Sequence, residues 1–421
     1  MLITPPTHQS KNILSDLITN KRFIVTWSVF YVVYLCFRFM SEFSEKAFAE
    51  SNVFVDVFIN YSGGFVRRGL LGQVFLWCYQ VGISPIWAAV SLSLSAFLVI
   101  AAYMIAQFRK HGYSLCLLTV GWFLGDIGLL GLAAMRRDYI IMCFFLLVVW
   151  LWKRMGIGRW VLLTNILVCL FILCYEPFAL FAIPFCVLLT RLRLKNWVKS
   201  VICWLLPALT FLICCKYAGG KEVYDAIVVS TADFLPSPGI MGFLKWGTIE
   251  PMKYHFAVNF LQFHHGIPVV LISFVSLSSI LFYSVNAIPV FTQDKLDFTN
   301  RRYTLAFLMS AFLFLSPMFT FLSIDYGRTC VYVCLSSYIL FFQLDEKERG
   351  HLLPQFVYSW ADRLIAFSDK HLRPTRFKIV FIMLFLGISA FTGGGIEEFI
   401  KGSEFGNMAN YFLTTIGTIP Q

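Results

Sequence analysis

Long apolar runs recur along the whole chain, and they constrain its fold more than any other feature. Of the 421 residues, 58% are hydrophobic and only 14% are charged, a balance typical of membrane proteins rather than of soluble globular domains. A spanning helix needs roughly 17 to 25 mainly apolar residues, which predicts an all-α, polytopic transmembrane helical bundle with about 11 spans. The predicted spans lie near residues 22–40, 85–107, 114–134, 139–152, 160–175, 178–190, 200–215, 267–290, 304–322, 329–344 and 379–392.

Basic residues fall in alternate connections between these runs. The positive-inside rule therefore places those connections and the N-terminus in the cytoplasm, and an odd number of spans places the C-terminus outside. The net charge of +11 comes from Lys and Arg residues concentrated in the short loops between apolar runs, so it does not indicate a nucleic-acid partner. The first apolar run has no small-residue cleavage site and is predicted to be a retained anchor. We expect one integral membrane domain over residues 1–421, with outer loops 41–84 and 216–266 and a cytoplasmic loop 345–378.

The two long outer loops have different compositions. In the first, apolar residues recur at roughly helical spacing beside polar ones, which predicts interfacial helices lying on the membrane surface. The second combines several glycines and prolines with Trp246, Tyr254 and His255. That mixture favours an irregular loop that caps a site.

Two arginine motifs are predicted on the outer side, where the basic loops are absent. The first, Gly64-Phe65-Val66-Arg67-Arg68-Gly69, combines flexible glycines with two planar donor forks and would suit a phosphate or diphosphate clamp through Arg67 and Arg68. Binding of lipid headgroups or neighbouring carboxylates is the alternative. The second motif, Arg136-Arg137-Asp138, occupies a tight turn. Its arginines are further candidate ligands, or Arg137 and Asp138 pair and cap the next helix.

Two carboxylate motifs are predicted on the same side. Glu176, between Tyr175 and Pro177, ends a hydrophobic hairpin, where desolvation would raise its pKa and suit it to acid–base catalysis; the pattern itself favours a structural helix cap. Asp325 precedes Arg328 in a glycine-containing turn, where charges must be paired or solvated. Asp325 is the preferred base and Arg328 its partner or another phosphate ligand, with a structural salt bridge as the alternative.

Other polar residues give weaker signals. Asp126 lies inside a predicted span and is either functional or a hydrogen-bonded structural group. His264-His265 lacks a second ligand cluster, and eleven of the twelve cysteines lie in apolar runs without CxxC spacing, so neither a metal site, a cofactor nor a disulfide framework is predicted. Alternative catalytic acids in the first outer loop, for most of which a solvated helix face is favoured, are Glu42, Glu45, Glu50 and Asp56.

In their order along the chain, the motifs Gly-Phe-Val-Arg-Arg-Gly-Leu-Leu-Gly, Arg-Arg-Asp, Tyr-Glu-Pro and Asp-Tyr-Gly-Arg resemble those of bacterial polytopic proteins of surface-polysaccharide loci. These are similar in architecture to GT-C-type glycosyltransferases and O-antigen polymerases. The resemblance implies a multi-pass enzyme of the bacterial inner membrane that acts at the periplasmic face in lipopolysaccharide-type polysaccharide biosynthesis. The aspartate motif that GT-C enzymes carry after their first span is missing, and Glu42 and Glu45 stand there instead.

The resemblance also implies partners: a polyprenyl phosphate- or diphosphate-linked sugar, an acceptor glycan, membrane lipids and other polysaccharide-assembly membrane proteins. Independently of it, arginine forks at a membrane surface would stabilise an anionic leaving group, and a carboxylate would accept the proton of the acceptor hydroxyl. The chain has no Walker A or dinucleotide-binding motif, in agreement with a lipid-linked donor.

Two other classes of protein remain open. A transporter or flippase would use a site near the bilayer midplane, usually in repeated halves, and Asp126 is the residue that favours it. A non-catalytic membrane scaffold would not require four charged outer motifs. Because the motifs gather at one face and no repeat is visible, the sequence favours the enzyme.

Overall fold

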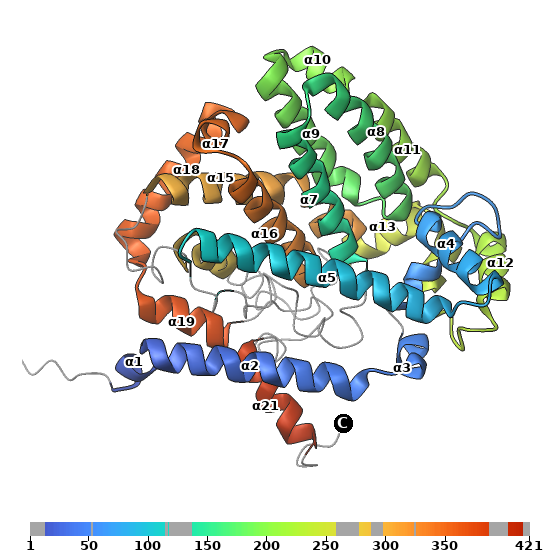
Figure 1. Cartoon of the computed structure of the whole chain (residues 1–421), viewed down its shortest axis with the longest axis horizontal. Coiled ribbons are helices and arrows are strands. Elements are labelled where there is room, and N and C mark those ends of the chain that lie inside the picture. Colours follow the sequence, from blue (N-terminus) through green and yellow to red (C-terminus); the bar gives the residue numbers. More distant parts are fainter. Residues whose placement is uncertain are drawn as a thin grey trace, which may run out of the picture.

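The computed structural model describes residues 13–51, 54–113, 117, 137–257, 278–287, 298–323, 326–386 and 403–415, and these contain helices and no strand. The predicted all-α class is therefore confirmed for this part of the chain (Figure 1). The elements, in chain order, are α1 (Ile13–Ile18), α2 (Lys21–Glu42), α3 (Glu45–Glu50), η1 (Phe54–Phe58), α4 (Gly69–Gln80), α5 (Pro85–Lys110), α7 (Asp138–Arg154), α8 (Ile157–Cys174), α9 (Phe178–Leu194), α10 (Trp197–Ile202), α11 (Leu205–Lys216), α12 (Lys221–Thr231), η5 (Gly239–Trp246), α13 (Ile249–Phe256), α15 (Phe298–Phe314), η7 (Met318–Leu322), α16 (Tyr326–Gln343), α17 (Glu346–Leu352), α18 (Gln355–Phe367), η8 (Ser368–Leu372), α19 (Arg376–Phe385) and α21 (Glu404–Thr415).

Three described helices are long and apolar enough to cross a bilayer, judged by length and composition. They cover Lys21–Ser41, Pro85–Lys110 and Ile157–Cys174, so each coincides with a predicted span. The predicted span 114–134, apart from residue 117, and most of 267–290 lie outside the described residues. The chain is thus compatible with a membrane protein, and the larger number of spans stays a prediction.

The predicted span near 200–215 is not one continuous helix. The chain breaks there into α10, which ends at Ile202, and α11, which begins at Leu205. Pro207 explains the break, because a proline ring clashes with the carbonyl four residues earlier, which here belongs to Cys203. Trp204, at the junction, is buried and donates from Nε1 to Thr190 Oγ1 at 2.9 Å.

Helices α7, α8 and α9 form consecutive antiparallel hairpins (Figure 1). Aromatic contacts join neighbours, such as the stacked rings of Phe144 and Phe171 and the pair Trp152 and Trp160. At 1.5 Å per residue, helices of 17 or 18 residues are about 26 Å long. The two ends of this bundle are therefore well separated, and each end gathers a different set of charges.

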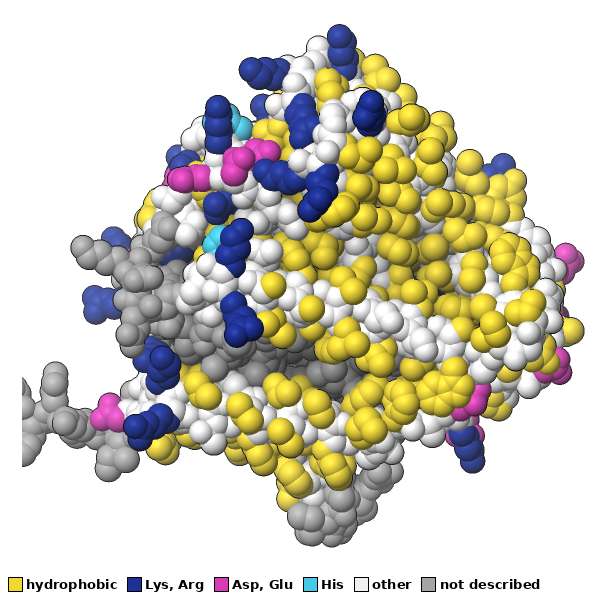
Figure 2. Space-filling model, in the orientation of Figure 1, with side chains coloured by type: hydrophobic (Ala, Val, Ile, Leu, Met, Phe, Trp, Pro, Cys, Tyr) yellow, Lys and Arg dark blue, Asp and Glu magenta, His cyan; other side chains and the backbone are white. Residues whose placement is uncertain are grey.

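One end gathers the basic connections. Lys153 at the end of α7 pairs with Asp345 and Glu348 of the α17 region. Arg193 at the end of α9 donates to the carbonyl oxygen of Trp152 at 2.6 Å. Figure 2 shows Lys and Arg side chains along the edge that runs from α10, past α17, to α1. The basic connections that the sequence assigned to the cytoplasm thus lie together at one end of the helical bundle. We call this end the basic end.

The other end holds the two predicted outer segments, and both need correction. All five residues of η1 are buried in the core, so this element has no exposed face of the kind predicted for an interfacial helix. Helix α4 is closer to the expectation, because it buries Leu71 and Phe75 and exposes Val74 and Trp77.

The second outer segment is helical through its described part, in α12, η5 and α13, so the predicted irregular loop is wrong. Its glycines and prolines lie mostly between helices. Gly219 and Gly220 precede α12, Pro238 precedes η5 and Gly247 follows it. The breaker residues therefore mark helix boundaries rather than a structureless loop.

Candidate functional site

Four of the charged motifs meet where several helix ends converge, opposite the basic end. Arg67 and Arg68 precede α4, Arg137 and Asp138 stand at the start of α7, Tyr175 and Glu176 form the α8–α9 turn, and Arg328 lies in the first turn of α16. Asp56 of η1 completes the group through its pair with Arg137. We call the set of these eight residues the arginine cluster: Asp56, Arg67, Arg68, Arg137, Asp138, Tyr175, Glu176 and Arg328.

Arg68 holds Glu176 with a two-pronged contact. Its Nε donates to Oε2 and its Nη2 to Oε1, each at 2.7 Å, the fork geometry in which arginine binds a carboxylate most strongly. Arg68 adopts a left-handed backbone conformation with φ of 64°, which costs a non-glycine residue roughly 1 to 2 kcal/mol. The contact with Glu176 helps to maintain that strained position.

The environment of Glu176 contradicts the predicted rise of its pKa. Burial does raise the pKa of this carboxyl, but the charges of Arg68 and Arg67, together with the hydrogen bonds from Arg68, outweigh burial and lower it to about 2. Glu176 is therefore a carboxylate at neutral pH. A group with so low a pKa is a weak proton acceptor, and it serves mainly to hold the two arginines.

Close backbone contacts fix the direction of the Arg67–Arg68 segment. A Cβ atom on Gly69 would lie 2.2 Å from the ring of Tyr61, and one on Gly72 would lie 2.0 Å from the carbonyl oxygen of Ile59. Only glycine allows the first turn of α4 to pack this tightly against residues 58–61. The glycines of the motif thus position the arginines through packing within the protein.

Arg137 pairs with Asp56 in the interior. Arg137 Nη2 lies 2.6 Å from Asp56 Oδ2, and the guanidinium also donates to the carbonyl oxygens of Asp56 and Cys174. Arg137 is completely buried. Asp56 is therefore not part of a solvated helix face, and Arg137 pairs with it rather than with the adjacent Asp138.

Arg328 pairs with Asp138 instead. Arg328 Nε lies 2.6 Å from Asp138 Oδ1, and its Nη2 donates to the hydroxyl of Tyr175 at 2.8 Å. The hydroxyl of Tyr332 also donates to Asp138 Oδ1. Asp138 is the first residue of α7, where a carboxylate interacts favourably with the helix dipole.

Tyr175 lies at the centre of the arginine cluster. The guanidinium carbons of Arg68, Arg137 and Arg328 lie 4.8, 5.1 and 5.3 Å from the centroid of its ring. Each distance is within the range of a cation–π interaction. Sequence reasoning treated Tyr175 only as a neighbour of Glu176, because no sequence pattern reveals that three distant arginines surround one ring.

Counted over its eight described residues, the arginine cluster carries an excess positive charge. It has four arginines and three carboxylates, and three of the arginines each have a carboxylate partner at 2.6 or 2.7 Å. The fourth, Arg67, is 3.5 Å from Glu176 Oε1 and shares that carboxylate with Arg68. Within the part of the chain that the structure describes, its buried Nε has no hydrogen-bond partner. Arg67 therefore has the weakest carboxylate contact of the four arginines.

His255 of α13 adds an ionisable group that the sequence had not assigned a role. Its pKa is lowered, chiefly by burial and also by the charges of Arg67 and Arg68, although a hydrogen bond to the backbone of Phe321 opposes this. Its Nδ1 is buried without a hydrogen-bond partner among the described residues. His255 is thus a neutral imidazole at neutral pH, within electrostatic range of the arginine cluster.

Several predicted residues are not part of this arrangement. Arg136, Asp325, Asp126 and His264-His265 lie outside the described residues, as does the side chain of Glu42. Glu45 accepts hydrogen bonds from Ser84 and from Trp87 Nε1 at the start of α5. Glu50 pairs with Lys46 on the surface. These last two carboxylates have local structural partners.

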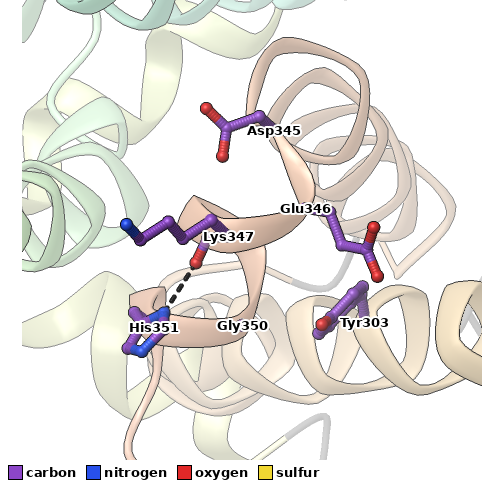
Figure 3. Close-up of a pocket in the computed structure, with 6 residues that line it drawn as sticks. All are labelled: Tyr303, Asp345, Glu346, Lys347, Gly350 and His351. Atoms are coloured by element: carbon purple, nitrogen blue, oxygen red, sulfur yellow. Dashed lines mark hydrogen bonds between the residues drawn. The ribbon is translucent and has the colours of Figure 1, made fainter.

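An open pocket of about 620 Å³ lies at the basic end, between α15 and α17 (Figure 3). It is lined by Tyr303, Asp345, Glu346, Lys347, Gly350 and His351. Asp345 already caps α17 and pairs with Lys153, and His351 Nδ1 contacts the carbonyl oxygen of Lys347. The polar groups of this pocket thus mainly stabilise α17, and the arginine cluster is the stronger candidate site.

Among the described residues, no group of three or more His, Cys, Asp or Glu side chains is arranged to hold a metal ion. Comparison of the chain with protein-family models, with curated proteins and with solved structures found no match.

Proposed function

We propose that this protein is a membrane glycosyltransferase or polysaccharide polymerase that takes a sugar from a polyprenyl phosphate or diphosphate at the extracytoplasmic face. The observation that carries the proposal is the excess positive charge of the arginine cluster, with Arg67 incompletely paired. A planar guanidinium matches the oxygens of a phosphate. The proposed anionic ligand is thus the phosphate group next to the sugar.

The position of the arginine cluster supports a lipid-linked substrate. The cluster lies at the end of α7, α8 and α9 opposite the basic end, and the positive-inside rule would put the basic end in the cytoplasm. The cluster would then lie at the extracytoplasmic surface, in a bacterium the periplasmic face of the inner membrane. The headgroup of a polyprenyl phosphate resides at such a surface, so its sugar would reach the site without leaving the membrane.

The proposed reaction transfers one glycosyl group. The bond between the anomeric carbon and the phosphate oxygen breaks, and its electron pair stays on the departing polyprenyl phosphate or diphosphate. A hydroxyl oxygen of the acceptor glycan bonds to the anomeric carbon and loses its proton to a base. Arg67 would stabilise the charge that develops on the leaving phosphate, while Glu176 would keep Arg68 in position.

Two residues are candidates for the base. The sequence favours Asp325. His255 is the second candidate, because it is neutral at neutral pH and its buried Nδ1 has no hydrogen-bond partner among the described residues. Asp325→Asn and His255→Gln preserve shape but remove the proton acceptor, so the variant that abolishes transfer while retaining donor binding identifies the base. Full activity in both variants would exclude both residues.

The test of the whole proposal uses purified protein in nanodiscs with a polyprenyl diphosphate oligosaccharide and an acceptor glycan. Products are separated on gels and identified by mass spectrometry. We expect extended or newly linked glycans, and we expect Arg67→Ala to reduce their rate by about 100-fold, as loss of a charge-stabilising donor does. Arg67→Lys should recover little, because an ammonium cannot reproduce the planar fork.

A matched control is Arg159→Ala, since Arg159 is an exposed arginine in the first turn of α8, at the opposite end from the cluster. This variant should keep the wild-type rate. If wild-type protein forms no covalent product but moves a solute across proteoliposomes, the protein is a transporter or flippase and the enzymatic proposal is wrong.

A further inference from the structure

Helix α18, in the predicted cytoplasmic loop, exposes an apolar stripe. Phe356, Trp360, Leu364 and Phe367 are 43% to 65% exposed. Their spacing of four, four and three residues places them on one face of the helix. The opposite face, with Tyr358, Ala361 and Ile365, is buried. The exposed stripe is therefore a second apolar surface, separate from the one that anchors the helix to the protein.

Contacts with α15 show how α18 lies. Three consecutive residues of α15 meet positions spread along α18 and η8: the ring of Tyr303 contacts Tyr358, Arg302 pairs with Asp362, and Arg301 pairs with Asp369. At 1.5 Å per residue, Tyr358 and Asp369 lie about 16 Å apart along their helix, whereas Arg301 and Tyr303 lie about 3 Å apart along α15. Helix α18 thus crosses the first turn of α15 at a steep angle. If α15 spans a membrane, α18 lies in the plane of its surface.

The exposed charges beside the stripe are mainly positive. Asp362 and Asp369 are engaged by Arg302 and Arg301. Arg363, Lys370 and Arg373 are exposed, and this region belongs to the basic edge of Figure 2. Aromatic and leucine side chains on one face with neighbouring basic residues are typical of helices that bind the interface of an anionic membrane.

We propose that α18 and η8 form an in-plane anchor that inserts its apolar stripe into the cytoplasmic leaflet and binds anionic lipid headgroups through Arg363, Lys370 and Arg373. Each basic residue near an anionic surface strengthens such binding by about fivefold. The anchor would hold the N-terminal end of α15 at the level of the headgroups. This inference does not depend on the proposed glycosyl transfer.

The test places the photoreactive residue p-benzoylphenylalanine at position 356, in full-length protein in nanodiscs of neutral and anionic phospholipid. After irradiation, intact-protein mass spectrometry identifies what the stripe touches. We expect lipid adducts, with the anionic lipid captured severalfold more often than its mole fraction predicts. The same probe at position 346, an exposed polar site on α17 at the same end, should give few lipid adducts.

Charge variants test headgroup recognition separately. Replacing Arg363, Lys370 and Arg373 with Gln should remove the preference for anionic lipid while leaving lipid capture itself. The matched control replaces three exposed lysines elsewhere, Lys46, Lys221 and Lys253, with Gln; it should keep the preference. Absence of lipid adducts at position 356, or capture of a protein there in native membranes, would overturn the proposal.

Discussion

The most direct test of the arginine cluster is Glu176→Gln, which removes a buried charge and keeps the shape of the side chain. The fall of the Glu176 pKa from 4.5 to about 2 corresponds to roughly 3 kcal/mol of folded-state stabilisation at neutral pH, at about 1.4 kcal/mol per tenfold change in an equilibrium constant. Loss of one partner of a buried ion pair typically costs about 3 to 5 kcal/mol. We therefore expect the free energy of unfolding to fall by about 3 kcal/mol.

The pH dependence gives this prediction a second readout. Because the pKa is lower in the folded state, the stabilisation from Glu176 is complete well above pH 4.5 and is lost as the pH falls toward 2. The difference between wild type and variant should thus be largest at neutral pH and shrink below pH 4. Thermal unfolding of detergent-purified protein, followed by tryptophan fluorescence and size-exclusion chromatography, measures both effects.

The control for this experiment is Glu250→Gln. Glu250 pairs with Lys253 on an exposed surface, where an ion pair contributes little to stability, so its loss should leave unfolding almost unchanged. If Glu176→Gln unfolds at the same temperature as Glu250→Gln at every pH, the interpretation of Glu176 as the anion that holds Arg68 and Arg67 is wrong.

Further predictions concern topology, packing and the central tyrosine. Accessibility tags after Asn300 should report the cytoplasm and tags near Gly239 the other side, since the basic loops alternate; a cytoplasmic Gly239 tag would reverse the orientation. Gly72→Ala should strongly reduce the yield of folded protein in size-exclusion chromatography because its Cβ would lie 2.0 Å from a carbonyl oxygen, whereas Gly158→Ala, with open space around it, should behave as wild type. Tyr175→Phe should lower the free energy of unfolding by about 1 to 3 kcal/mol, because Arg328 would lose a hydrogen-bond acceptor; unchanged thermal unfolding would contradict this.

The sequence predicted several features that depend on composition and local pattern. Apolar length identified α2, α5 and α8 as possible spans, and the alternation of basic loops anticipated a basic end. It also selected Arg67, Arg68, Arg137, Glu176 and Arg328, all of which the structure brings into one cluster. These features were accessible because helix length and charge placement are set by residues close together in the chain.

The partners of those charges were decided only by the tertiary structure. Arg137 pairs with Asp56 and Arg328 with Asp138, across long sequence separations that carry no local signal. The same packing lowers the pKa of Glu176, because two arginines outweigh burial, whereas from the sequence burial alone predicted a rise. In an apolar helical chain, sequence context can thus identify a charged residue as a candidate site residue. Its protonation state and its role depend on the opposite charges that folding brings within a few ångströms of it.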